Sequence, residues 1–114
     1  MSHLSILPTV LRDETLLAQV LQDLGLEPLG QGHLRGFAGE RQSVMLRVQL
    51  PEGLWLGWSR QSDGSLALVG DLQRLSRSRS VQSLIGRLTR RYAARQALQA
   101  AAVALPGASV QLVG

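Results

Sequence analysis

Apolar residues between positions 13 and 25, in the segment DETLLAQVLQDLG, recur with the spacing of one helical face. The residues of this face are Leu16, Leu17, Val20, Leu21 and Leu24. Positions four and eight apart lie on one side of an α-helix, so the pattern predicts an amphipathic helix. Asp13 is suited to cap its start, and Gly25 is suited to a left-handed exit at its end.

Alternating apolar and polar residues predict a series of strands after this helix. The strands are expected at residues 33–39, 43–50, 54–60 and 65–71. They are divided at Gly39, at the turn PEG (51–53) and at the turn SDG (62–64). Because connections this short join antiparallel neighbours, the pattern predicts a meander.

The predicted strand SVMLRVQL, residues 43–50, has one apolar and one more polar face. Its apolar positions are Val44, Leu46, Val48 and Leu50, and its other positions include Met45, Arg47 and Gln49. Since side chains alternate across a strand, one face is expected in the core and the other toward water.

A second, longer helix is predicted from about residue 80 to residue 105. Its apolar stripe contains Val81, Leu84, Ile85, Leu88 and Tyr92. Pro106 and Gly107 would end it. At about 1.5 Å per residue this helix would be roughly 35 Å long, enough to cross a small sheet.

The order of the predicted elements indicates the fold class. HLSIL (3–7) ahead of Pro8 is expected as a first strand, and SVQLV (109–113) as a last one. The sequence therefore predicts an α+β fold, with a mainly antiparallel sheet and two helices packed on one face. A chain of 114 residues, of which 45% are hydrophobic, supplies one ordinary core, so a single domain spanning 1–114 is expected.

Positive charge is concentrated in the C-terminal part of the chain. All twelve basic residues are arginine, and residues 72–114 carry seven of them with no acidic residue. Arg87, Arg90 and Arg91 share an arc of the predicted helix away from its apolar stripe, and Arg77 and Arg79 precede its predicted start. These five arginines form the candidate partner-binding site.

Three interpretations of these arginines stay open: a docking face for an acidic protein, a nucleic-acid contact, and a solvated helix face. Near the predicted helix start, Ser78, Ser80 and free helix amides would suit an anion. Nucleic acid is the least favoured ligand, because no aromatic platform lies between the arginines and no RNA-binding signature is visible.

The two tryptophans provide a second candidate surface. Trp55 and Trp58 lie three positions apart on a predicted strand, so they point to opposite faces, one into the core and one outward. The outward tryptophan, together with Met45, would form an apolar contact surface, and a homo-oligomer is one use of it.

Residues that carry catalysis or metal binding are not found in any known arrangement. The chain has no cysteine, and its two histidines, His3 and His33, have no acidic residue at helical ligand spacing. No acid–base pair, nucleophile motif, phosphate loop or cofactor motif is present. We therefore expect no catalytic residue, no metal site and no cofactor.

Short motifs along the chain resemble one known family. They are MSH followed by T and RD (1–13), DLG (23–25), RG and G (35–39), DG with LV and D (63–71), and LTRRYA (88–93). The chain is similar to the family called hypothetical chloroplast reading frame thirty-five, a domain of unknown function shared by cyanobacteria and some plastid genomes. The resemblance implies a place in the cyanobacterial cytoplasm or plastid stroma and a link to the photosynthetic lifestyle, and it supplies no functional residue.

The expected function is therefore that of a small non-enzymatic accessory or adaptor protein, which binds a protein partner, with an acidic partner as the favoured kind. The alternative is a basic RNA-binding protein without sequence specificity. No apolar run approaches membrane-spanning length, so the chain is expected to have no membrane span and to be cytoplasmic.

Overall fold

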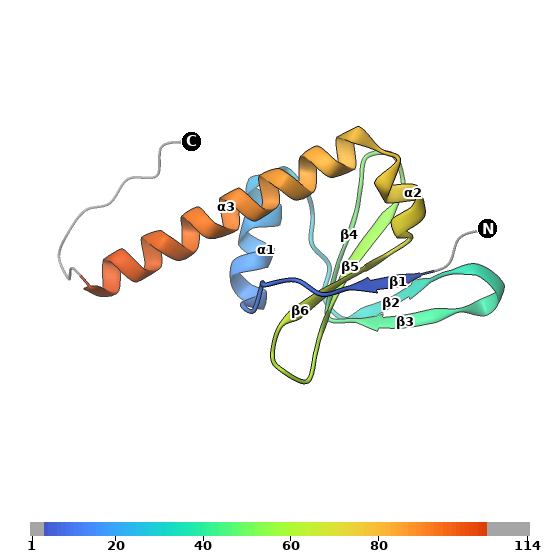
Figure 1. The fold of residues 1–114 in the computed structure, drawn as a ribbon, viewed down its shortest axis with the longest axis horizontal. Helices are drawn as coiled ribbons and strands as arrows, with labels where there is room; N and C mark the ends of the chain where they lie inside the picture. Colours follow the sequence, from blue (N-terminus) through green and yellow to red (C-terminus); the bar gives the residue numbers. More distant parts are fainter. Residues whose placement is uncertain (1–3, 105–114) are drawn as a thin grey trace.

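A four-stranded antiparallel sheet is the centre of the computed structural model, which describes residues 4–104 (Figure 1). Its strand order is β1-β6-β5-β4, with β1 at Ser5–Leu7, β4 at Leu46–Gln49, β5 at Trp55–Arg60 and β6 at Leu66–Gly70. A two-stranded sheet contains β2 (Gly32–Arg35) and β3 (Arg41–Val44), joined through a short 3-10 turn at Phe37–Gly39. The helices are α1 (Glu14–Asp23), α2 (Leu72–Ser76) and α3 (Arg79–Ala104).

Helix α1 forms where the sequence predicts it. The Asp13 carboxylate accepts a hydrogen bond from the Leu16 backbone N–H at 3.0 Å, which caps the helix start. Gly25 follows the helix with a φ of +82°, a conformation that glycine adopts without strain. Leu16, Leu17 and Val20 are fully or almost fully buried, so the predicted apolar face is the buried one.

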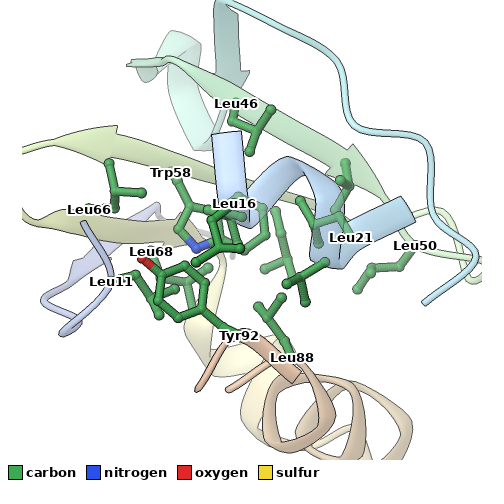
Figure 2. Close-up of a cluster of buried hydrophobic side chains, with 14 of the residues drawn as sticks. Leu11, Leu16, Leu21, Leu46, Leu50, Trp58, Leu66, Leu68, Leu88 and Tyr92 are labelled. Carbon is green, nitrogen blue, oxygen red and sulfur yellow. The ribbon is translucent and has the colours of Figure 1, made fainter. Parts of the chain in front are cut away.

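The helices cover one face of the four-stranded sheet, and the predicted α+β fold is confirmed. The main core joins leucines of α1 to Trp58 and Leu68 of the sheet and to Leu88 and Tyr92 of α3 (Figure 2). The Tyr92 hydroxyl also accepts a hydrogen bond from the Asp13 backbone N–H at 3.0 Å. This bond ties α3 to the start of α1, so a side chain of the core also fixes how the two helices cross.

Helix α3 is confirmed at nearly its predicted length, but a second helix before it was not predicted. α3 has 26 residues and runs across α1 (Figure 1). α2 is only five residues long; the Asp71 carboxylate caps it by accepting from the Arg74 backbone N–H at 3.3 Å, and Leu75 packs into the core. A helix of this length contains too few turns to produce a hydrophobic period. Among the helices of residues 4–104, none is long and apolar enough to cross a bilayer.

The prediction of one strand at residues 43–50 is wrong. The chain bends at Met45 and forms two strands, β3 and β4. Leu46 and Val48 lie in the main core as expected, but Val44 lies in a separate small cluster with Leu34 and Val69. The predicted common face is therefore wrong for Val44. The bend places β2 and β3 over the sheet face that the helices leave open.

Strands were also predicted at both ends of the chain. The first predicted strand is confirmed as β1, which pairs antiparallel with β6. The predicted strand at 109–113 lies outside the described residues.

Candidate partner-binding surface

Four arginines in the first half of α3 and just before it are exposed to solvent. They are Arg77, Arg79, Arg87 and Arg90, here called the arginine surface. None of them forms an ion pair with another residue of the range 4–104. Val81, Leu88 and Tyr92 are buried on the opposite side of α3. The four guanidinium groups therefore point away from the core, where a partner can reach them.

Arg91, the fifth predicted site residue, has a partner inside the protein. Its Nε lies 3.1 Å from the Asp23 carboxylate at the end of α1. Arg95 binds the same carboxylate through two nitrogens, at 2.6 and 2.8 Å. The structure therefore separates Arg91 from the arginine surface and assigns it, together with Arg95, to the contact between α1 and α3.

The ionisation of Asp23 reflects these contacts. The hydrogen bond from Arg95 is the main cause that lowers the pKa of Asp23, burial opposes it, and the hydrogen bond and charge of Arg91 add to it. In return, the hydrogen bond to Asp23 raises the pKa of Arg95. The charged form of Asp23 is thus the form that the folded protein favours.

Replacing Asp23 with asparagine is expected to lower the free energy of unfolding by about 1 kcal/mol at neutral pH. Since folding lowers the pKa of Asp23 below its ordinary value of 3.8, this stabilisation is complete above about pH 3.8 and is lost as the pH falls through the folded-state pKa. Urea unfolding of both proteins from pH 7 to pH 2 measures it. The exposed Glu27→Gln variant is the control, and a difference that persists unchanged at pH 2 would contradict the assignment.

The anion site predicted at the start of the long helix is already occupied by groups of the protein. The Ser78 hydroxyl accepts from the Val81 backbone N–H at 3.3 Å, and the Ser80 hydroxyl donates to the Glu52 carboxylate at 3.0 Å. Arg79 is the first residue of α3, whereas Arg77 caps the end of α2, where positive charge is favourable. The helix start is therefore an internally satisfied cap, and the arginines remain as the feature that a partner can use.

A shallow hollow of about 270 Å³ lies beside the arginine surface. Arg87 and Glu52 line it, together with the apolar residues Leu24, Leu50 and Leu84. Charge and apolar surface are thus adjacent at this place, as they are at the centre of many protein interfaces.

The two tryptophans point to opposite faces of β5, as predicted. Trp58 is 1% exposed and belongs to the core, so it is not available to a partner. Trp55 is 37% exposed, and the Arg47 guanidinium lies over its ring, 5.7 Å from the centroid. Met45 is half-buried. Trp55 therefore stays as the candidate contact residue, and a homo-oligomer through it stays a prediction.

Comparison with protein families identifies a relationship for most of the chain. The model of the family described as "Protein of unknown function (DUF1257)" matches residues 20–107. The chain belongs to this family. No significant match was found among curated proteins or solved structures. The family match includes every residue of the arginine surface and both tryptophans.

The chemistry of the arginine surface is that of its guanidinium groups. Within residues 4–104, no three His, Cys, Asp or Glu side chains are arranged to hold a metal ion. Guanidinium groups cannot release a proton near neutral pH, but they donate paired hydrogen bonds to carboxylates and phosphates. The arginine surface is therefore suited to bind an anionic partner.

Proposed function

We propose that this protein is a non-enzymatic adaptor, which binds an acidic protein partner through the arginine surface. The observation that supports this most is the contrast between Arg91, which the fold neutralises with Asp23, and Arg79, Arg87 and Arg90, which have no such partner among the described residues. Unpaired charges on one surface add to each other's field, and such a field attracts and orients an oppositely charged protein.

The spacing of the arginines along α3 supports a protein as the partner. Arg79 and Arg90 are eleven residues apart, so they lie on nearly the same side of the helix, about 17 Å apart along its axis. This spacing suits several carboxylates on one partner element better than a single small anion.

The hollow next to Arg87 supports a protein as the ligand. An acidic partner segment that carries an aliphatic or aromatic side chain would place that side chain against Leu24, Leu50 and Leu84, while its carboxylates meet the arginines. Apolar anchors surrounded by polar contacts provide most of the binding energy in many interfaces.

RNA binding is the alternative, because a basic face also attracts phosphates. Proteins that bind single strands without sequence preference usually add aromatic side chains on which bases stack. Tyr92 is the one aromatic residue of α3, and it is 4% exposed, so it offers no such platform. The observations therefore favour a protein partner.

The cellular setting of this proposal comes from the resemblance to the chloroplast reading frame family. It supports a role in the cytoplasm of a cyanobacterium or in a plastid stroma, in a process connected with photosynthesis. The adaptor function does not depend on that setting.

The test is a pulldown from native extract with the double variant Arg87→Glu/Arg90→Glu. Nuclease-resistant protein partners of the wild type are expected to be lost by this variant, since both side chains lie off the core and their reversal repels an acidic surface. The same interactions should weaken as salt is added. Circular dichroism of the variant is expected to match the wild type.

A matched control changes the net charge by the same amount at another place. Arg35→Glu/Arg41→Glu reverses two exposed arginines that face each other on β2 and β3, and it is expected to keep the partners. If the variant on α3 keeps every partner, the arginine surface is only solvated. If nuclease removes all partners, the protein binds RNA instead.

A further inference from the structure

A cavity of about 380 Å³ lies between the two sheets and α2, and none of its lining residues belongs to the arginine surface. It is bounded by the end of β2, by Arg47 of β4, by the turn before β5 and by α2. Apolar side chains line part of it: Leu4, Leu34, Leu54 and Leu75. This volume is within the range of small-ligand sites.

Three arginines line the same cavity. Arg35 extends from β2, Arg47 from β4 and Arg74 from α2, and His33 lies beside them. None of these guanidinium groups forms an ion pair with any residue that the structure describes. One carboxylate, Asp71, is also present, and it caps α2. The cavity thus has an excess of positive charge.

The Arg47 guanidinium lies between two groups of the protein. On one side it faces the Trp55 ring, 5.7 Å from the centroid. On the other side it lies against Gly32, where an added Cβ would be 2.7 Å from both its Nε and its Cζ. Its Nε is buried and has no hydrogen-bond partner within residues 4–104. A side chain at position 32 would displace the end of Arg47 from this place.

A partly buried guanidinium such as that of Arg47, which has no ion pair with a carboxylate, is unusual if its role is only to stabilise the fold. A buried polar group that lacks a partner costs stability, and ion pairing is the common way to offset that cost. Arg91 and Arg95 are stabilised in this way by ion pairs with Asp23. Arg47 has no such ion pair among the described residues.

We propose that this cavity binds a small organic phosphate. The three guanidinium groups would hold the phosphate, because their paired donors match its oxygens. The leucines and the edge of Trp55 would contact the apolar body of the ligand. Inorganic phosphate would leave that apolar lining uncovered, and a neutral ligand would leave the charges unmatched. The site is independent of the adaptor function and shares no residue with the arginine surface.

The test follows the Trp55 indole N–H and the Arg47 Nε–H by proton–nitrogen NMR, with phenyl phosphate as the probe at constant ionic strength. Both signals are expected to shift and saturate together. Phenyl phosphate is expected to bind at least about tenfold more tightly than inorganic phosphate and than benzyl alcohol. Equal affinity for either of these simpler probes, or no saturable shift, would overturn the proposal.

Variants show whether the binding belongs to this cavity. Arg47→Gln is expected to weaken phenyl phosphate binding at least about tenfold, and Arg35→Gln, on the exposed ribbon, several-fold. Arg77→Gln removes the same charge outside the cavity and is expected to change affinity less than about twofold. If Arg47→Gln does not fold, Arg35→Gln decides. An equal loss in Arg35→Gln and Arg77→Gln would mean attraction by net charge alone, and it would overturn the site.

Discussion

Replacing Trp58 with alanine is expected to lower the free energy of unfolding by about 3 to 5 kcal/mol, the range for a large buried aromatic side chain. Trp58 is 1% exposed and lies at the centre of the sheet, paired with Leu46 on one side and Leu68 on the other. Figure 2 shows its ring beside Leu16 of α1, so its loss would leave a cavity between the sheet and the helices. Urea unfolding followed by circular dichroism measures the loss.

Trp55→Ala is the matched control on the same strand. Because Trp55 is 37% exposed and lies outside both buried clusters, its replacement is expected to cost less than about 1 kcal/mol. Similar losses for both variants would show that the two tryptophans do not occupy opposite faces of the sheet.

The sequence indicates which tryptophan is buried, in addition to predicting that the two point to opposite faces. In the strand LWLGWSR, Leu54 and Leu56 alternate with Trp55 and share their face with Trp58. The more apolar face of a half-buried strand is the one that enters the core. That pattern identifies Trp58 as the core residue, and the structure places it there.

The arginines show where prediction from the sequence ends. The helical period is enough to expect Arg87 and Arg90 on the exposed side of α3, because that depends only on local geometry. The pairing of Arg91 and Arg95 with Asp23 depends on how α1 and α3 cross, and these residues are 68 and 72 positions apart. No local pattern contains that information.

The helix start illustrates the same limit at shorter range. Asp71 is a recognisable cap residue, yet only five helical residues follow it, and no period could identify α2. The contact between Ser80 and Glu52 joins residues that are 28 positions apart. The sequence alone therefore predicts an anion site that the Glu52 carboxylate occupies in the folded protein.

The cavity is a further feature that long-range contacts create. Arg35, Arg47 and Arg74 are scattered among strands and a helix in the sequence, and none of them follows a motif. They line one cavity because β2 folds over β5 after the bend at Met45, while the bridge between Leu29 and Arg47 holds the preceding segment against β4. The bend is therefore one of the features on which the candidate phosphate site depends.

Replacing Gly57 with alanine tests this bend, and it is expected to lower the free energy of unfolding by about 1 to 3 kcal/mol. A Cβ at position 57 would lie 2.6 Å from Val44 Cγ1 and 3.0 Å from Leu34 Cδ1, so Val44, and with it β3, must shift. The measurement is urea unfolding together with the NMR signals of residues 32–44, which are expected to shift. Gly30→Ala is the control, because nothing lies within 4 Å of a Cβ there. If both variants are equally stable and the signals of 32–44 do not move, β2 and β3 do not pack on Gly57.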